Sequence, residues 1–273
     1  MKIIKRLLFI FLFIFSNNTT SGDSLYVYTS AFYTFGKYST GGNSNSIAGY
    51  ATLSFNGKSF VTLGYDNLNI EYITGKYLQQ NYTFSYLQNL FPSYLKVSYS
   101  YIGGKYTQTG QTSASFDNTH LVSLEYYFYS KMFYLGLAAS YIKQSGYTQL
   151  NVYQITPRIE WIVSTKVYLS TKPNYTYVSD LRNLFSVAGY ISWNSIQDVY
   201  LKLGGFVGKR ALYFDTDLLT IYNQNETQTN LFTAQMDYIP SKNFKLTAGY
   251  QHSSFSGYSI DYFILGIKTA IKF

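Results

Sequence analysis

The chain lacks cysteine altogether, and this absence removes several kinds of chemistry at once. It excludes disulfide bonds, thiolate nucleophiles, cysteine-ligated metals and anchoring through a lipidated cysteine. Charged residues are also scarce, at 12% against about 25% in ordinary soluble domains. Tyrosine, in contrast, occurs 32 times, and its amphipathic ring suits surfaces that meet both lipid and water.

Long apolar runs are absent as well. The longest one, residues 7–15, is less than half of the roughly 20 residues that a transmembrane helix requires. It follows three basic residues, Lys2, Lys5 and Arg6, and precedes a small polar stretch. This order predicts a secretory signal peptide over residues 1–22. Cleavage is expected after Ser16 or near Gly22, neither of which has a clean A-x-A pattern, and an uncleaved anchor is the alternative.

Several site signals are missing too. No Lys/Arg cluster follows residue 6, so the net charge of +8 does not indicate a nucleic-acid partner. No Gly-rich phosphate loop and no metal-spaced group of His or carboxylate residues occurs. The sequence therefore predicts no cofactor, no metal and no nucleic-acid binding.

What the sequence does contain is alternation with a period of two, which is typical of β-strands with one apolar face. Between residues 94 and 103, for example, one face carries Leu95, Val97, Tyr99 and Tyr101, and the other carries Lys96, Ser98 and Ser100. Fourteen such segments can be counted: 25–38, 46–56, 59–72, 77–88, 93–103, 118–130, 132–143, 148–163, 166–177, 183–194, 198–209, 227–239, 243–255 and 258–273.

Short turns and longer, more polar connections alternate between these segments, and the segments are long enough for a tilted bilayer span. We therefore predict one domain, residues 23–273: a closed, antiparallel, up-and-down transmembrane β-barrel of about 14 strands, with 12 or 16 as alternatives. The apolar phase slips between Asp66 and Glu71, which predicts a bulge or a missed turn. Pro157 and Pro173 fall inside strands, where each removes a hydrogen-bond donor.

The last predicted strand ends in a distinctive pattern. Apolar residues at alternate positions lead to a carboxy-terminal aromatic residue: Phe263, Leu265, Ile267, Ile271 and Phe273. This pattern resembles the assembly signal of bacterial outer-membrane barrels. The resemblance implies an outer-membrane location, surrounding membrane lipid and lipopolysaccharide, and a transient partnership with the barrel assembly machinery. It leaves the oligomeric state open.

Two further stretches carry a second resemblance. Residues 199–208 and 244–250 are similar to strands in the carboxy-terminal half of YaiO-type outer-membrane barrels. That family has no settled activity that could be transferred residue by residue.

If the apolar faces meet lipid, the opposite faces line a lumen. The inward ionisable residues are then mostly basic: Lys96, Arg158, Lys172, Lys202, Lys245, Lys268 and Lys272, against Glu125, Glu160 and Asp237. An open lumen of this kind would favour anions weakly. Alternatively, the charges pair across strands and close the interior. The longest connection, residues 210–226, is expected to be a solvated loop, with a lumen plug or a ligand contact as alternatives.

These observations favour a non-enzymatic, porin-like channel or a surface and structural component. A second hypothesis concerns His252, Ser254 and Asp261. A two-residue turn at 256–257 would pair His252 with Asp261 and place all three residues outside the barrel at headgroup level. The His-x-Ser spacing is similar to that of outer-membrane lipid A deacylases, which implies lipid A acyl hydrolysis, although those enzymes use a Glu. A hydrogen-bonded polar pair is the simpler interpretation, and a partner-binding barrel of an envelope or secretion machine is a third function.

Overall fold

The structure is a computed structural model that describes residues 24–111, 113–146, 149–217, 219–222 and 226–273. The predicted signal peptide, residues 1–22, lies outside the described residues. The described residues form strands and turns, and they include no helix long and apolar enough to cross a membrane.

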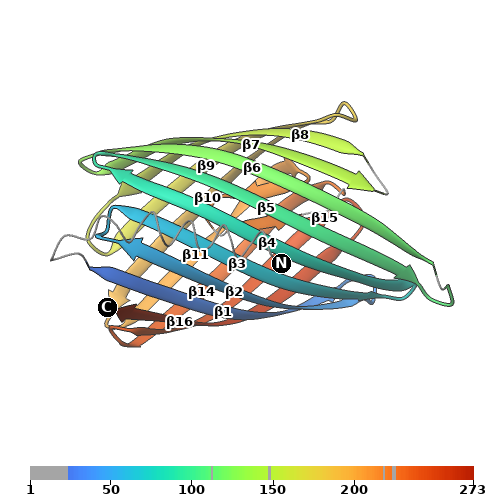
Figure 1. Cartoon of the computed structure of the whole chain (residues 1–273), viewed down its shortest axis with the longest axis horizontal. Helices are drawn as coiled ribbons and strands as arrows, with labels where there is room; N and C mark the ends of the chain where they lie inside the picture. The colour runs from blue at the N-terminus through green and yellow to red at the C-terminus, as the bar shows by residue number, and fades with distance from the viewer. Residues whose placement is uncertain (1–23, 112, 147–148, 218, 223–225) are drawn as a thin grey trace, which may run out of the picture.

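Fourteen strands close into one antiparallel barrel (Figure 1). They are β1 (Leu25–Tyr38), β2 (Asn43–Phe55), β3 (Ser59–Tyr72), β4 (Gly75–Leu90), β5 (Ser93–Gln108), β6 (Ala114–Ser130), β7 (Phe133–Gly146), β8 (Leu150–Ile162), β9 (Val167–Val178), β10 (Asn183–Ile196), β11 (Val199–Arg210), β14 (Gln228–Ser241), β15 (Phe244–Phe255) and β16 (Ser259–Lys272).

Each strand pairs with its neighbours in chain order, and β16 closes the barrel by pairing with β1. The predicted fold and strand number are confirmed, and the alternatives of 12 and 16 strands are wrong. β1 begins and β16 ends at the same rim, which we call the terminal rim. The opposite rim carries the longer connections and is called the loop rim.

The outer surface of the barrel is apolar over most of its height. In β16 the outward side chains include Phe263, Leu265 and Ile267, each at least 40% exposed. Exposed large apolar side chains occur on every barrel strand, which no monomeric protein in water tolerates over such an area. Together with closure, which leaves no unpaired strand edge, this surface is suited to lipid.

The bulge predicted between Asp66 and Glu71 is wrong. β3 pairs with β2 and with β4 through this segment without any shift of register. The apolar phase slips for another reason: Asp66, Leu68 and Ile70 all line the lumen, because the inner wall itself is apolar near the loop rim.

The two prolines have a local effect. Pairing between β8 and β9 is interrupted between Ile155 and Ile159 and then resumes at the same register. At that register Pro157 lies opposite Pro173, so the two missing N–H donors fall in one gap of the ladder. The strands continue on either side because each proline-bearing strand remains paired with its other neighbour.

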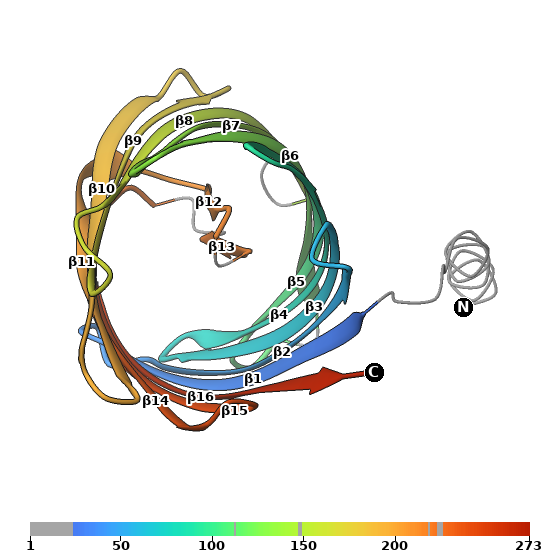
Figure 2. The same ribbon diagram turned by 90° about the vertical axis from the view of Figure 1, so that its left-hand side faces the viewer.

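The connection between β11 and β14 does not extend into solvent. It forms a small hairpin of two strands, β12 (Tyr213–Asp215) and β13 (Thr220–Tyr222), that lies inside the ring of barrel strands (Figure 2). All six residues from Ala211 to Thr216 are buried. The expectation of a solvated loop is therefore wrong, because this connection has an apolar seat to occupy within the barrel.

Candidate functional site

The seat of the hairpin is an apolar patch on the inner wall near the loop rim. Six consecutive strands, β5 to β10, each contribute to it, with Ile102, Leu121, Ile142, Leu150, Val152, Val178 and Leu184. Leu212, Phe214 and Leu219 of the hairpin complete the same cluster, and Phe214 is fully buried. Burying a side chain of this size stabilises by roughly 1.5–3 kcal/mol, so apolar contact helps to hold the hairpin to this wall.

A glutamine fixes the orientation of the hairpin on the wall. The Gln154 side-chain Nε2 donates to the Phe214 carbonyl at 3.0 Å, and the Phe214 N–H donates to Gln154 Oε1 at 3.2 Å. Gln154 is buried, so this paired exchange satisfies backbone groups that water does not reach. The side chain takes the place of a neighbouring strand for this edge of β12.

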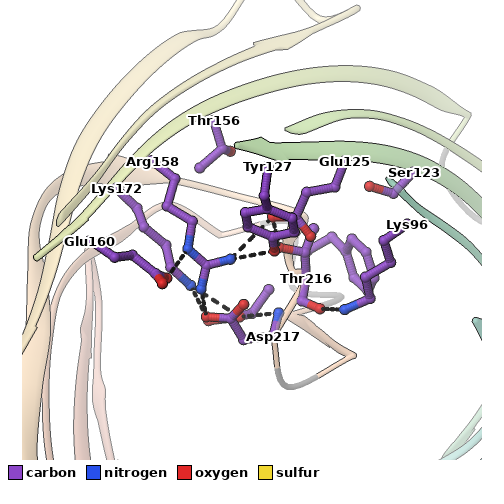
Figure 3. A network of polar contacts seen from close by, with 12 residues as sticks. Lys96, Ser123, Glu125, Tyr127, Thr156, Arg158, Glu160, Lys172, Thr216 and Asp217 are labelled. Carbon is purple, nitrogen blue, oxygen red and sulfur yellow. Dashed lines mark hydrogen bonds and ion pairs between the residues drawn. The ribbon is translucent and has the colours of Figure 1, made fainter. Parts of the chain in front are cut away.

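Deeper in the lumen, a charged network holds the tip of the hairpin (Figure 3). Arg158 of β8 is its centre: it forms ion pairs with Glu125 at 3.2 Å, with its strand neighbour Glu160 and with Asp217 of the hairpin. The Arg158 guanidinium also lies over the Tyr127 ring, 5.0 Å from the centroid. Arg158, Glu125 and Glu160 are each buried, so the charges compensate one another where solvation is poor.

Two lysines complete this network. Lys172 of β9 pairs with Asp217 and, at 3.8 Å, with Asp215, while Lys96 of β5 donates to the Thr216 carbonyl. Partial burial raises the pKa of the Asp217 carboxyl, but the charges of Lys172 and Arg158 lower it by more, so the pKa lies well below its ordinary value. Asp217 therefore remains ionised at neutral pH.

The base of the hairpin is held by Arg210, the last residue of β11. Its guanidinium lies between two rings, 3.7 Å from the Phe206 centroid and 4.2 Å from that of Tyr213. Its Nε donates to Gln228 Oε1 at 2.9 Å, across the pair of strands that flank the hairpin. This contact fixes the point at which the chain turns inward.

The hairpin leaves the other side of the lumen unfilled. A cavity of about 1040 Å³ lies toward the loop rim, mostly against β1–β4 and β14–β16. A second cavity of about 590 Å³ lies toward the terminal rim and is bounded in part by Asp217 and Leu219 of the hairpin. Phe32, Tyr50 and Lys268 line both cavities and therefore lie where the two spaces adjoin; we call these three side chains the waist.

The waist combines aromatic rings with a positive charge. Phe32 and Tyr50 meet edge to face with their centroids 6.3 Å apart, and the Lys268 Nζ lies 5.3 Å from the Phe32 centroid. Lys202 also faces the larger cavity, 4.4 Å from the Tyr190 centroid. Among the described residues, neither lysine has a carboxylate within ion-pair distance, whereas Lys245 pairs with Asp237 at 2.7 Å.

The structure places all ten predicted lumen residues on inward-facing positions, but it divides them into two groups. Lys96, Glu125, Arg158, Glu160 and Lys172 meet the hairpin network or belong to it. Lys202, Asp237, Lys245 and Lys268 line the cavities, and Lys272 lies over the Tyr26 ring at the terminal rim. The residues of the predicted assembly signal, Phe263, Leu265, Ile267, Ile271 and Phe273, are exposed on the outer face.

The sequence analysis did not predict that Phe214 and Gln154 hold this connection against the wall, nor that Asp215 and Asp217 pair with Lys172. A signal was present: Ile102 and Leu121 interrupt otherwise polar inward faces at the same height. Apolar residues on a lumen face predict a covering segment, since water would otherwise contact them.

The second predicted site is present on the outer surface. β15 and β16 pair at the predicted register, with His252 opposite Asp261 and Ser254 opposite Ser259. His252 Nδ1 lies 2.8 Å from Asp261 Oδ1, and Ser254 Oγ lies 3.3 Å from His252 Nε2. Among the described residues, no group of His, Asp and Glu side chains is placed to hold a metal ion.

Comparison with known proteins finds similarity in fold but not in sequence. No family model and no curated protein matches the chain. The solved structure of the CymD monoaromatic hydrocarbon channel is similar, with a TM-score of 0.57 and 8% identity over 93% of this chain and 89% of that one. OccK7 (OpdD) of Pseudomonas aeruginosa and OccAB4 of Acinetobacter baumannii match with TM-scores of 0.45 and 0.43, at 8% and 9% identity, over 93% and 94% of this chain and all of theirs. At such identities the likeness is one of fold alone.

Proposed function

We propose that the chain is an outer-membrane channel for small solutes, in which the hairpin of β12 and β13 narrows the lumen. One observation carries this proposal: the two cavities share Phe32, Tyr50 and Lys268 on the side that the hairpin leaves unfilled. A barrel whose interior was filled by paired charges would leave no such unfilled space on both sides of these residues. The pathway thus runs past the hairpin, between it and strands β1–β4 and β14–β16.

The charges along this pathway set its preference. In the hairpin network three cations, Arg158, Lys172 and Lys96, face four carboxylates, Glu125, Glu160, Asp215 and Asp217, so most of its charge is compensated within the network. Lys202 and Lys268, in contrast, face the cavity without an ion-pair partner among the described residues. Asp66, Asp117 and Glu226 line the wider part near the loop rim, and Asp237, which also lines it, is paired with Lys245. We therefore propose a weak preference for anions, exerted at the waist.

The aromatic waist adds a second selection. Phe32 and Tyr50 present apolar ring surface beside the Lys268 ammonium, so a small solute with a flat apolar part and a negative group would meet both. Large hydrated solutes would be excluded by the hairpin, which is fixed to the wall by apolar contacts and ion pairs.

The test is single-channel conductance of the purified full chain in planar lipid bilayers. Stable steps are expected, with a reversal potential in a salt gradient that shows modest anion preference. If the correctly folded barrel gives no steps at any voltage, the lumen is closed and the channel proposal is wrong.

The location and partners belong to the same proposal. The apolar exterior and the exposed carboxy-terminal residues Phe263 to Phe273 support insertion into an outer membrane by its barrel assembly machinery, with membrane lipid and lipopolysaccharide as neighbours. Cleavage of residues 1–22 and membership of the YaiO-type family stay predictions. Fractionation of the expressing cells tests the outer-membrane location, and sequencing of the mature amino-terminus tests cleavage of the signal peptide.

A further inference from the structure

We propose that Ser254, His252 and Asp261 form a serine hydrolase site on the outer surface of the barrel, and that its substrate is an ester-linked acyl chain of a membrane lipid. This activity is separate from the lumen, because the three side chains project from the opposite face of β15 and β16. The inward neighbours on β15, among them Gln251 and Ser253, line the cavity instead.

The three side chains are arranged as acyl transfer requires. The two ring nitrogens of His252 have different partners: Nε2 is 3.3 Å from Ser254 Oγ, and Nδ1 is 2.8 Å from Asp261 Oδ1. In this order the histidine can take the serine proton while the carboxylate holds the ring and stabilises its charged form.

The paired strands β15 and β16 fix the arrangement of these three side chains. His252 and Ser254 are two residues apart on β15, so their side chains share a face, and Asp261 lies directly opposite His252 on β16. The Tyr250 hydroxyl donates to Asp261 Oδ1 at 2.6 Å, which fixes the carboxylate from below. Sites built on paired strands keep their geometry better than sites on loops.

The surroundings indicate a lipid substrate. The site lies near the loop rim, and the next outward row toward the middle of the barrel contains Phe35, Tyr250 and Phe263. The Tyr250 and Phe263 rings are in contact, with centroids 5.4 Å apart. An acyl chain lying along these rings would bring its ester to the height of Ser254. His252 and Asp261 are about two-fifths exposed, so a lipid in the surrounding leaflet can reach them.

Two neighbouring strands supply polar groups at the same height. Asn230 of β14 lies opposite Ser254 and is exposed, so its side-chain amide is the donor we assign to the developing oxyanion. Lys37 of β1 lies opposite Asp261 and is exposed, where its ammonium can meet the phosphate of a lipid headgroup. The polar cluster thus follows the boundary between acyl chains and headgroups.

The reaction needs only the ester and water. Ser254 Oγ attacks the ester carbonyl carbon while its proton moves to His252 Nε2, and the oxyanion collapses by breaking the bond to the alcohol oxygen, which receives that proton from His252. The acyl group is then bound to Ser254. Water attacks this acyl-enzyme, gives one proton to His252 and releases the fatty acid, and the proton returns to Ser254 Oγ.

The test measures fatty-acid release by the full-length protein in mixed micelles. Two substrates distinguish the lipid source: a diacyl glycerophospholipid and a lipid A-containing lipopolysaccharide. The native protein is expected to release fatty acid from one of them. Ser254→Ala should reduce release to that of protein-free micelles, whereas Ser259→Ala, which removes a hydroxyl directly opposite on the same outer face, should leave it unchanged.

Asp261 acts through His252, so it is a positioning residue and its variant must affect turnover rather than affinity. Asp261→Ala should lower kcat by about 100-fold while KM stays within about threefold. A reactive organophosphonate probe should label the peptide that contains Ser254 in the native protein, and labelling should disappear in His252→Ala. Each variant is first shown to be folded by heat-modifiable migration on a denaturing gel.

Two results would overturn the proposal. One is that the folded native protein releases no fatty acid from either lipid and is not labelled by the probe. The other is equal release by the native protein and Ser254→Ala. Conductance of Ser254→Ala should match that of the native barrel, because the site does not face the lumen.

Discussion

The two walls of the lumen differ in the side chains that they carry and in whether the hairpin covers them. The wall of β5–β10, which we call the hairpin wall, is apolar near the loop rim and densely charged below it, and the hairpin covers both zones. The wall of β1–β4 and β14–β16, the open wall, carries polar and aromatic side chains with dispersed charges, among them Asp66, Asp237 and Lys268, and faces a cavity of about 1040 Å³. The difference shows that this barrel narrows itself on one side only.

The physical reason lies in what each wall buries. On the hairpin wall, side chains such as Ile142, Val152 and Val178 have no exposed surface, which stabilises the hairpin by removing apolar area from water. On the open wall, Tyr38, Ile70, Phe255 and Ile260 pack among themselves near the loop rim and need no cover from another segment. The hairpin therefore has a single stable position, and the space opposite remains for solutes.

The largest effect is expected when this asymmetry is removed. Deleting residues 212–222 and joining the ends with a short glycine–serine linker would uncover the hairpin wall and widen the lumen. Single-channel conductance should rise severalfold, because the hairpin occupies the section next to the waist. Unchanged conductance in the folded deletion variant would mean that the hairpin does not bound the pathway.

The next effect comes from the charged network. Arg158→Met leaves Glu125, Glu160 and Asp217 without their common partner, and loss of one member of a buried ion pair costs about 3–5 kcal/mol. Amide hydrogen exchange in the hairpin should become much faster. The matched control is Lys268→Met on the open wall, which has no ion-pair partner among the described residues and should leave the hairpin protected.

A substitution in the apolar seat should destabilise the hairpin slightly less than loss of the charged network does. Phe214→Ala removes the largest fully buried side chain of the hairpin and should destabilise its seating by about 3 kcal/mol. Frequent transitions to a higher conductance level are the expected readout. Phe232→Ala, on the outer face of β14, removes the same group from lipid and should give native traces.

A smaller effect concerns the waist. Lys268→Glu replaces the positive charge between the two cavities and should shift the reversal potential toward cation preference without a large change in conductance. Lys143→Glu changes the same charge on an exposed position of β7, outside the lumen, and serves as control. Equal shifts in both variants would show that surface charge, rather than the waist, sets the preference.

The smallest effect is expected from mild acid. Because the pKa of Asp217 is lowered in the folded barrel, its pairing with Lys172 and Arg158 stabilises the hairpin above the ordinary pKa of an aspartate, about 3.9, and is lost as pH falls through the lowered value. Conductance should therefore stay constant between pH 7 and pH 5. Opening of the hairpin within that range would contradict the assigned pairing.

Much of this architecture could be predicted from the sequence, for a local reason. Alternation is read over neighbouring residues, so it gave the fourteen strands, the inward position of residues such as Lys268, and the pairing of His252 with Asp261 across a two-residue turn. The segment from Asp66 to Glu71 was misinterpreted because alternation assumes one polar and one apolar face. In this segment, near the loop rim, the inward residues Leu68 and Ile70 are apolar and the outward residues Asn67, Asn69 and Glu71 are polar.

The sequence by itself therefore predicted the barrel, about fourteen strands and the side on which most residues lie, since these depend on a two-residue period and on short turns. Only the tertiary structure decided where the hairpin lies. Its seat is assembled from Ile102 on β5 through Leu184 on β10, single residues that closure of the barrel brings together from distant parts of the chain. Their contact with Phe214, and the ion pairs of Arg158 with Asp217, exist only once the strands have curved into a ring.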